Sequence, residues 1–419
     1  MTGGDWTPPM SGGEIQSILE LGEVMKNKLV VDRLEVANKT VLVRVDFNVP
    51  LKDGIVGDDT RIRAALPTIR HLMAQKAKVV LVSHLGRPKG TVAKEFTLGP
   101  VAKRLEELLE HKVDFSPECV GVVARDHVNA LTPGGVLLLE NIRFYPGEEE
   151  NNPDFAASLA DLAEVFVSDA FGTVHRAHAS TAGVASHFNQ SAAGFCIAKE
   201  LEFLGQALHN PKSPYVAIVG GAKVGDKIAV LRSMLQRADT LLIGGAMAYT
   251  FLKAQGHEIG KSLLDEPNIG LASELMAQAT RENKQILLPS DHIVAATIGP
   301  DAEASTCGID IPADMIGLDI GPESVARYKA ALADAQMVVW NGPMGMFELP
   351  QFQGGSFAIA HALAESNAVS IVGGGDSVAA VNKAGVGDQI NHISTGGGAS
   401  LEFLEGKQLP GIEVLTNVG

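Results

Sequence analysis

The sequence predicts an α/β protein of two doubly wound, Rossmann-like parallel-sheet domains joined by a helical hinge. The chain has 419 residues, more than one ordinary core holds. Near-continuous Val/Ile/Leu runs alternate with helix-period stretches, which is typical of parallel strands covered by helices on both faces. This series ends near residue 199 and starts again near residue 215, so we expect two domains.

The first series of elements lies between residues 40 and 172. The stretch 60–75 places Ile62, Leu66, Ile69 and Met73 on one face of a helix. A second helix is expected at 98–110. Strands are expected at 40–48, 78–86, 136–144 and 165–172.

The second series follows a connecting segment at 193–210, which we expect to be a continuous helix and a mechanical element. Its strands are expected at 215–221, 240–246, 285–294, 337–343 and 368–375. The predicted domains are therefore 28–192 and 193–404. Residues 1–27 form an extension with a Gly/Pro-rich start and a short helix, to which no function is assigned.

Composition excludes several classes of protein. The net charge of −15 shows no basic excess for nucleic acid, although a basic pocket for a small anion stays compatible with it. No apolar run approaches the ~20 residues that span a bilayer. The N-terminus has no apolar core of a signal peptide, so we expect a cytoplasmic protein. Cys119, Cys196 and Cys307 lie far apart and are expected to be buried free thiols.

Five basic residues, here called the basic rim, each fall at a predicted strand end or in the turn after it. Carboxyl ends of parallel strands meet at one edge of a sheet, where ligands gather. Arginine pairs with carboxylate or phosphate through two parallel hydrogen bonds, so we expect a small, multiply anionic ligand. Asp46 and Asn48 can bind hydroxyls or orient the arginines. Structural salt bridges are the alternative for any single member. The five are Arg61, His84, Arg87, Arg143 and Arg176.

Two glycine-rich turns, "GGAK" (220–223) and "GGGDS" (373–377), form what we call the glycine rim. Each follows an apolar strand and leads into a helix, where glycine lets the backbone approach a phosphate. Lys223 would meet phosphate, Asp376 a magnesium ion, and Glu348 a ribose hydroxyl. Tight strand–helix geometry alone is the alternative.

Two standard nucleotide motifs do not fit the glycine rim. In "VGGAKVGDKI" (219–228) the spacing of a Walker A loop is present, but Asp226 stands where that loop has its lysine. The dinucleotide fingerprint G-x-G-x-x-G fails after Gly375, because Asp376, Ser377 and Val378 follow it.

Taken together, these motifs resemble the phosphoglycerate kinase family, from about residue 28 to the C-terminus. The matching stretches are "RVDFNVP" (44–50), "SHLGRP" (83–88), "LENIRF" (139–144), "DAFGTVHRAHAS" (169–180), "VGGAKVGDKI" (219–228), "LLIGGAMAYTF" (241–251), "GLDIGPES" (317–324), "VWNGPMGMFE" (339–348), "GGGDS" (373–377) and "STGGGASLEFLEGKQLPG" (394–411).

The resemblance implies a first domain that binds 3-phosphoglycerate or 1,3-bisphosphoglycerate and a second that binds ADP or ATP with Mg²⁺. It implies that Arg61, Lys223 and Gly375 are catalytic, that Asp376 is the metal ligand, that the tail 405–419 packs on the first domain, and that the protein is a monomer. The implied substrate residues are Asp46, Phe47, Asn48, Arg61, His84, Leu85, Gly86, Arg87, Arg143 and Arg176. The implied nucleotide residues are Lys223, Lys227, Asn341, Gly374, Gly375, Asp376 and Ser377 for phosphates, and Gly244, Gly245, Gly317 and Glu348 for adenosine.

The implied reaction is reversible phosphoryl transfer between an acyl phosphate and ADP. Both acceptor oxygens are already anionic, so no general base is needed, and positioning with charge neutralisation must supply the rate. Because the substrates sit on separate rims, we expect closure about 193–210 and the "STGGG" segment (394–398).

Two other functions remain open at this point. A nicotinamide-dependent oxidoreductase would fit two Rossmann-like domains, but it lacks the fingerprint and leaves the basic rim unexplained. A catalytically inactive binding protein of the same fold would fit as well, although every residue expected to be catalytic is present.

Overall fold

A computed structural model describes residues 27–418 of the chain. These residues divide into two compact units, one reaching Gly205 and including the segment from Gln408, the other spanning Gln206–Lys407. Both are built of parallel sheets and helices, which confirms the predicted α/β class with two Rossmann-like domains. The helix expected within residues 1–26 lies outside the described residues.

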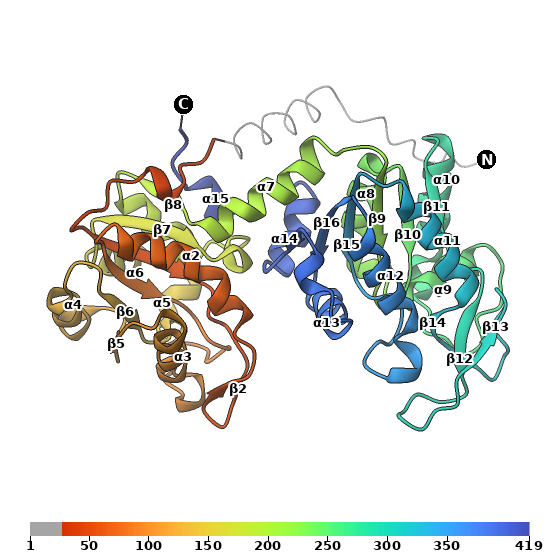
Figure 1. The fold of residues 1–419 in the computed structure, drawn as a ribbon, viewed down its shortest axis with the longest axis horizontal. Helices are drawn as coiled ribbons and strands as arrows, with labels where there is room; N and C mark the ends of the chain where they lie inside the picture. Colours follow the sequence, from red (N-terminus) through yellow and green to blue (C-terminus); the bar gives the residue numbers. More distant parts are fainter. Residues whose placement is uncertain (1–26, 419) are drawn as a thin grey trace. The chain divides into compact units, whose positions relative to one another are not determined.

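The first unit contains a six-stranded sheet in which every neighbouring pair is parallel (Figure 1). Its spatial order is β5-β6-β4-β1-β7-β8. Its strands are β1 (Thr40–Val45), β4 (Lys78–Val82), β5 (Val113–Ser116), β6 (Val136–Leu139), β7 (Val165–Asp169) and β8 (Ser191–Ala193). A short hairpin of β2 (Leu51–Lys52) and β3 (Ile55–Val56) follows β1.

Helices cover both faces of this sheet. Side chains alternate along a strand, so Val43 packs with α2 and α3 in one core, while Leu42 packs with α4 and α6 in another. On α2 the buried face is Ile62, Leu66 and Ile69 as predicted, joined by Leu72; Met73 is only partly buried. The helices are α2 (Thr60–Ala74), α3 (Gly99–Leu109), α4 (Gly121–Ala130), α5 (Pro146–Glu149), α6 (Pro153–Ala160) and α15 (Pro410–Glu413).

The second unit has a six-stranded parallel sheet in the order β11-β10-β9-β15-β16-β17. Numbered along the chain this is 3-2-1-4-5-6, the Rossmann order. Its strands are β9 (Tyr215–Val219), β10 (Thr240–Ile243), β11 (Gln285–Leu287), β15 (Met337–Asn341), β16 (Val369–Gly373) and β17 (His392–Ile393).

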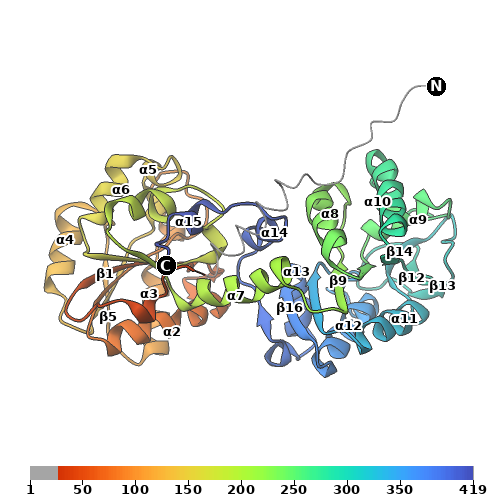
Figure 2. The same cartoon turned by 90° about the horizontal axis from the view of Figure 1, so that it is seen from above.

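Helices α11, α12 and α13 pack on one core of this sheet, and α8 contacts β9 and β10. Figure 2 shows the helices of each unit on either side of its sheet. The helices are α8 (Ile228–Arg237), α9 (Met247–Ala254), α10 (Ile269–Arg281), α11 (Pro322–Ala333), α12 (Gly354–Glu365), α13 (Gly375–Lys383) and α14 (Gly398–Leu404).

The strand predicted at 285–294 is wrong as one element. The structure has β11, which ends at Leu287, and a separate strand β12 (His292–Ala295). Pro289 lies between them, and proline cannot donate to a strand ladder. β12 belongs to an antiparallel sheet with β13 (Ser305–Cys307) and β14 (Ile316–Ile320), which the sequence analysis did not predict.

The connecting helix α7 (Phe195–His209) is continuous, and the division between the units falls inside it, after Gly205. The last described residues belong to the first unit: Gly411 N–H donates to Val174 O at 2.9 Å, and Leu29 N–H donates to Thr416 O at 2.8 Å. These two hydrogen bonds tie both ends of the described chain to unit 1.

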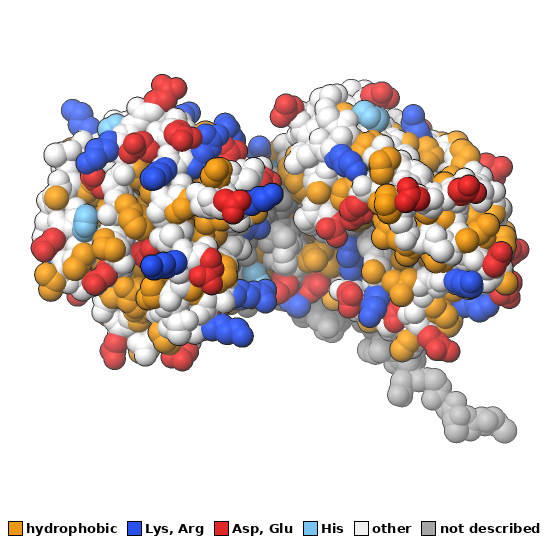
Figure 3. Space-filling view, turned by 90° about the horizontal axis from the view of Figure 1, so that it is seen from below, with side chains coloured by type: hydrophobic (Ala, Val, Ile, Leu, Met, Phe, Trp, Pro, Cys, Tyr) orange, Lys and Arg blue, Asp and Glu red, His pale blue; other side chains and the backbone are white. Residues whose placement is uncertain are grey.

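All three cysteines are free, but only Cys119 is buried, so the expectation of buried thiols is wrong for the half-buried Cys196 and Cys307. Within residues 27–418 no helix is both long and apolar enough to cross a membrane. On the faces that Figure 3 shows, Lys and Arg side chains are interspersed with Asp and Glu.

Candidate active site

Both sheets place functional side chains at their carboxyl edges, where the strand order reverses. In unit 1 the reversal lies between β1 and β7, and in unit 2 between β9 and β15. Ligands of doubly wound sheets bind outside the strand ends at such points. Asp46 and Asn48, which hold parts of the basic rim's edge, lie in the loop after β1, and Arg176 lies in the loop after β7. In unit 2 the "GGAK" turn follows β9, and Pro343, which Gly220 approaches closely, follows β15.

Arg61 is held by the loop that follows β1. Its guanidinium NH1 donates to Asp46 Oδ2 at 2.9 Å and to Asn48 O at 3.4 Å, and its side chain is 36% exposed. Arg61 was predicted at a strand end or in the turn after one, but it lies in the first turn of α2, after the β2–β3 hairpin. Its carboxylate partner leaves the outer part of the guanidinium available to an anion.

The turn after β4 is fastened by side chains of the same rim. Gly86 N–H donates to Asn48 Oδ1 at 2.9 Å, and Arg143 NH1 donates to Gly86 O at 2.8 Å. Phe47 and Leu85 were expected to contact substrate, yet both side chains are in the hydrophobic core. Their backbone N–H groups donate to Ser83 Oγ and Asn141 Oδ1. These two residues therefore shape the turns instead of presenting side chains to a ligand.

Two members of the basic rim, His84 and Arg143, have pKa values that burial and neighbouring cations lower. Burial, reinforced by the positive charges of Arg44, Arg143 and Arg61, holds the pKa of His84 well below its ordinary value. Burial also lowers the pKa of Arg143, with Arg176 and Arg87 acting in the same direction. Arg87 and Arg176 are exposed. The edge is thus a concentrated positive site around a neutral imidazole.

Arg44, which the sequence analysis did not single out, lies directly behind the basic rim. It is 1% exposed, on β1, and its NH2 lies 3.2 Å from His84 Nδ1. A charged residue inside the apolar run "TVLVRV" was the available sequence signal. A buried guanidinium must be satisfied by specific partners, so its presence indicates a built polar network.

The glycine rim depends on close backbone contact between the ends of β9 and β15. A Cβ on Gly220 would lie 2.0 Å from Pro343 O, so only glycine fits there. Lys227 Nζ donates to Gly220 O at 2.7 Å, to Asn341 O at 3.1 Å and to Asn341 Oδ1 at 2.7 Å. Burial lowers the pKa of Lys227 to about 8. Lys227 thus fastens the two strand ends to each other.

The side-chain amide of Asn341 has a buried hydrogen-bond donor without a partner among the described residues. Its Oδ1 accepts from Lys227, and because an ammonium only donates, this contact fixes which end of the amide is oxygen. Its Nδ2 is buried and makes no hydrogen bond among the described residues. Gly374, with φ +87° at the N-cap of α13, lies beside it. This donor suits an anionic ligand at the start of α13.

Helix α13 begins at Gly375 as predicted for the "GGGDS" turn. Asp376 is exposed in its first turn, while Ser377 is buried and accepts from Gly342 N–H through Oγ. The first N–H groups of a helix have no partner inside it, so this end offers donors and a positive dipole to phosphate.

The "GGAK" turn was expected to lead straight into a helix, and this is wrong. Helix α8 starts only at Ile228, after a 3₁₀ turn at Gly225–Lys227. Gly225 N–H donates to Asp265 Oδ2 at 2.8 Å, which holds the intervening loop. Lys223 is exposed in this loop. Its ammonium group is therefore open to a ligand, unlike that of Lys227.

The residues expected near adenosine fall on different elements of unit 2. Gly244 and Gly245 follow β10, and their N–H groups donate to Val219 O and Met344 O. Gly317 lies on β14, in the small antiparallel sheet. Glu348 is exposed after β15, and its carbonyl accepts from Lys383.

Two buried carboxylates, one in each unit, were not predicted from the sequence. Asp169 ends β7 and accepts from Cys196 N–H at 2.8 Å at the start of α7. Asp319 on β14 accepts from Gly355 N–H at 2.6 Å at the start of α12. Burial raises the pKa of each to about 7. They secure the helices that flank the sites.

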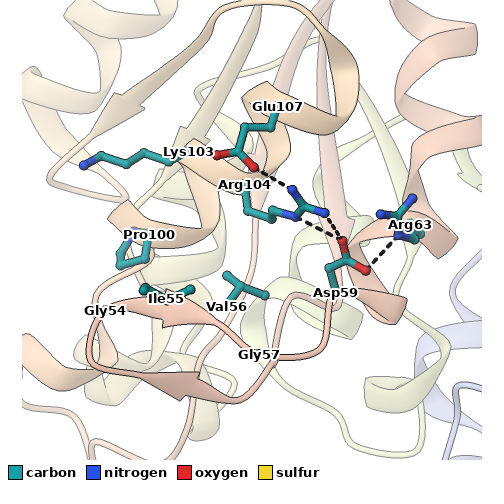
Figure 4. Close-up of a pocket in the computed structure, with 10 residues that line it drawn as sticks. All are labelled: Gly54, Ile55, Val56, Gly57, Asp59, Arg63, Pro100, Lys103, Arg104 and Glu107. Atoms are coloured by element: carbon teal, nitrogen blue, oxygen red, sulfur yellow. Dashed lines mark hydrogen bonds and ion pairs between the residues drawn. The ribbon is translucent and has the colours of Figure 1, made fainter.

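A surface cavity of about 610 Å³ lies in unit 1, between the β2–β3 hairpin and α3 (Figure 4). Asp59 there accepts from Arg63 at 2.7 Å and from Arg104 through two nitrogens, at 3.0 and 2.7 Å. No member of either rim lines this cavity. Arg104 also pairs with Glu107, and the pairs of Asp59 anchor the start of α2, two residues before Arg61.

Comparison with known proteins identifies the family. The family model for phosphoglycerate kinase matches residues 31–407. The chain is 56% identical to the phosphoglycerate kinase of Moorella thermoacetica over 390 residues, covering 93% of this chain and 99% of that protein. It is 54% identical to that of Acidobacterium capsulatum over 401 residues, covering 93% of this chain and 99% of that protein.

Solved structures agree with the sequence comparison. The phosphoglycerate kinase of Coxiella burnetii superposes with a TM-score of 0.85 at 45% identity, covering 92% of this chain and 98% of that one. That of Pyrococcus horikoshii gives 0.81 at 34% identity, with the same coverage. This chain therefore belongs to the phosphoglycerate kinase family.

Proposed function

We propose that this member of the phosphoglycerate kinase family catalyses the reversible, Mg²⁺-dependent transfer of a phosphoryl group from 1,3-bisphosphoglycerate to ADP, giving 3-phosphoglycerate and ATP. The observation that carries the proposal is the family membership together with two different anion sites at the switch points of two sheets. One is built from arginines, the other from glycines, a helix start and Lys223.

The basic rim would bind the phosphoglycerate. Arg61, oriented by Asp46 at 2.9 Å, is positioned to meet the transferring group, and the buried Arg143 holds the turn at Gly86. Arg87 and Arg176 are exposed and add positive charge beside Arg143. Paired guanidinium donors suit both the carboxylate and the phosphate of this substrate.

The glycine rim would bind the nucleotide. The hydrogen-bond donors available here are the N–H groups of Gly375 and Asp376 at the start of α13, the buried Nδ2 of Asn341, and the exposed Lys223 in the "GGAK" loop. Adenosine would lie along Gly244, Gly245 and Gly317, with Glu348 accepting from the ribose. Lys227 acts mainly by fixing Asn341 and Gly220.

No side chain needs to remove a proton, because a carboxylate and a diphosphate oxygen are already ionised near neutral pH. We propose direct in-line transfer, with Arg61, Lys223 and the start of α13 neutralising charge on the moving group. In such a mechanism the rate comes from position and preformed dipoles.

The donor set fits magnesium bound chiefly through the nucleotide. Within residues 27–418 no group of three or more His, Cys, Asp or Glu side chains could hold a metal ion alone. Asp376 is one exposed carboxylate in the first turn of α13, and its charge opposes part of the lowering that burial causes in the pKa of Lys227. Mg²⁺ commonly takes one or two carboxylates plus substrate phosphates, and when bound it would neutralise phosphate charge.

The test is ATP formation from ADP, 1,3-bisphosphoglycerate and Mg²⁺. Arg61→Ala and Lys223→Ala are expected to lower kcat/KM by about 10²–10³-fold, the effect of removing one preorganised donor. Matched controls are Arg70→Ala on the same helix α2 and Lys253→Ala on α9 of unit 2, which should stay near wild type. A folded wild-type protein without turnover would refute the proposal and favour a binding protein of the same fold.

We further propose that the substrate-bound units close about α7 and the "STGGG" segment, and that the protein is a cytoplasmic monomer. Small-angle scattering with both substrates should then show a smaller radius of gyration than either single complex. Sedimentation should give the mass of one chain, 44.0 kDa. Unchanged scattering would remove closure from the proposal and leave the reaction to be tested separately.

A further inference from the structure

Behind the basic rim, a chain of four buried side chains runs from Glu148 through Ser180 and Arg44 to His84. Glu148 is fully buried and accepts from Ser180 through both carboxylate oxygens, from Oγ–H at 2.6 Å and from N–H at 2.9 Å. Arg44 Nε donates to Ser180 Oγ at 2.8 Å, and NH2 lies 3.2 Å from His84 Nδ1. Arg44 NH1 donates to Val45 O.

The direction of every hydrogen bond in this chain is fixed by its two charged members. A carboxylate only accepts, so the Ser180 hydroxyl hydrogen points to Glu148 and leaves its oxygen lone pairs for Arg44. A guanidinium only donates, so His84 Nδ1 must be the acceptor. A neutral imidazole carries one proton, which must then be on Nε2.

From this geometry we propose that Arg44 is a positioning residue that selects the Nε2–H tautomer of His84, so that the ring presents a hydrogen-bond donor to the anionic substrate. With the other tautomer, Nε2 would direct a lone pair at an anion. Nε2 makes no hydrogen bond among the described residues, and His84 is 4% exposed. The contribution to substrate binding rests on the proposed function; the tautomer does not.

The surroundings of His84 keep the ring neutral. Burial is the largest effect lowering its pKa, and besides Arg44 the cations Arg143 and Arg61 act in the same direction. His178 has its own pKa lowered to about 4, chiefly by burial. A neutral donor can thus sit among cations without adding a further buried charge.

Nitrogen NMR of the full-length protein tests the tautomer directly. Long-range proton–nitrogen correlation of the ¹⁵N-histidine-labelled chain at pH 7, without ligand, separates protonated from unprotonated ring nitrogens, and loss of one ring's signals in His84→Gln assigns them. We expect Nδ1 of His84 to be unprotonated and Nε2 protonated. A proton on Nδ1, or a charged ring at pH 7, would overturn the proposal.

Two substitutions separate tautomer selection from mere filling of the core. Lysine, like arginine, only donates, whereas a glutamine amide can donate or accept. Arg44→Lys should therefore keep the Nε2–H tautomer, while Arg44→Gln should give a mixture. Arg44→Gln should also raise KM for 3-phosphoglycerate on the order of tenfold, the size of a lost hydrogen bond to a charged group.

A double variant completes the experiment. With His84→Gln already present, Arg44→Gln should change KM for 3-phosphoglycerate by less than about twofold, because its effect acts through the imidazole. A wild-type tautomer with unchanged KM in Arg44→Gln would overturn the proposal. If Arg44→Gln does not fold, the wild-type and Arg44→Lys spectra still decide it. Absence of phosphoryl transfer with Nδ1 unprotonated would count against the proposed function alone.

Discussion

The basic rim and the glycine rim occupy equivalent edges of two parallel sheets but offer different groups to the anions that we propose they bind. In the basic rim, side chains would form the contact surface: Arg61 is oriented by Asp46, and Arg143 holds the Gly86 turn. In the glycine rim, the backbone forms it, with Gly220 against Pro343 and α13 starting at Gly375. One type of sheet edge therefore supports both solutions, and the loop residues decide which is used.

Both rims nevertheless contain the same kind of internal support. In each, a cation that can only donate fixes a side chain that could point either way: Arg44 faces His84 Nδ1, and Lys227 binds Asn341 Oδ1. The opposite atom of each partner is thereby made a donor. The comparison indicates that donor polarity toward an anion is set from behind the site, by groups that need not touch the ligand.

The largest effect is expected where the backbone itself is the contact surface. Gly220→Ala would place a Cβ 2.0 Å from Pro343 O. We expect a loss of about 1–3 kcal/mol of stability in unit 2 and about 100-fold weaker Mg-ADP binding, since small misplacements have such effects. Titration calorimetry with Mg-ADP and urea denaturation measure both.

The matched control for this change is Gly270→Ala on α10, where a Cβ would meet nothing within 4 Å. It should alter stability by no more than about 1 kcal/mol. Binding of 3-phosphoglycerate to unit 1 should be unchanged in both variants. Normal nucleotide affinity in Gly220→Ala would show that side chains, not backbone contact, dominate the glycine rim.

The next largest effect concerns pH and should appear in both units. Asp169 and Asp319 have pKa values raised from 3.8 to about 7 by burial. Between these values the folded chain keeps a proton that the unfolded chain has lost, so the free energy of unfolding falls as pH rises. An asparagine resembles the protonated acid and removes this fall. Relative to wild type, Asp169→Asn and Asp319→Asn should each gain on the order of 3 kcal/mol from pH 5 to pH 8.

Urea unfolding of each variant at several pH values between 4 and 8 measures this gain. A matched control is Asp310→Asn, because the Glu258 N–H and His257 hold the pKa of that exposed carboxyl below its usual value. It should show no gain at higher pH. If only one of the two variants gained free energy of unfolding at higher pH, the two carboxylates would not both be protonated in the folded chain, despite their similar burial.

A smaller effect should separate the rims from each other. Asp46→Asn removes the charge that orients Arg61 at 2.9 Å. We expect KM for 3-phosphoglycerate to rise about 3- to 10-fold, the range for a weakened charge-assisted hydrogen bond, with KM for Mg-ATP unchanged. Steady-state kinetics in the direction of ATP consumption measures both constants. An equal rise in the two would contradict independent rims.

The smallest effect is expected from the ion cluster in Figure 4. Arg104→Met removes two contacts to Asp59, but these side chains are partly exposed, and such pairs contribute little. KM for 3-phosphoglycerate should change by less than about twofold and Tm by no more than about 2 °C. A tenfold rise in KM would instead show that this cluster positions Arg61 through the start of α2.

Much of the scaffold was predictable from the sequence because apolar runs and helix periodicity are local properties. The strands β1, β4, β9 and β16 begin within a residue of their predicted starts and stop earlier, where polar loop residues leave the ladder. The predicted strand at 285–294 was wrong because pattern alone could not show that β11 and β12 join different sheets.

The candidate site was only partly predictable, for a related reason. The sequence motifs identified the exposed arginines, the glycines and the family that shares these motifs. They did not show that Phe47 and Leu85 face the core, or that the ammonium group of Lys227 donates a hydrogen bond to Asn341. Those facts depend on which groups meet after folding.

The sequence by itself determined the α/β class, the two series of strands, the residues at the strand ends and the family. Only the tertiary structure decided which donors pair within the protein and which stay open to a ligand, as with Arg44, Asn341 and Asp169. The physical reason is that hydrophobic periodicity is written into neighbouring residues. Hydrogen-bond direction and burial instead arise between residues tens to hundreds of positions apart, such as Arg44 with Ser180 and Lys227 with Asn341.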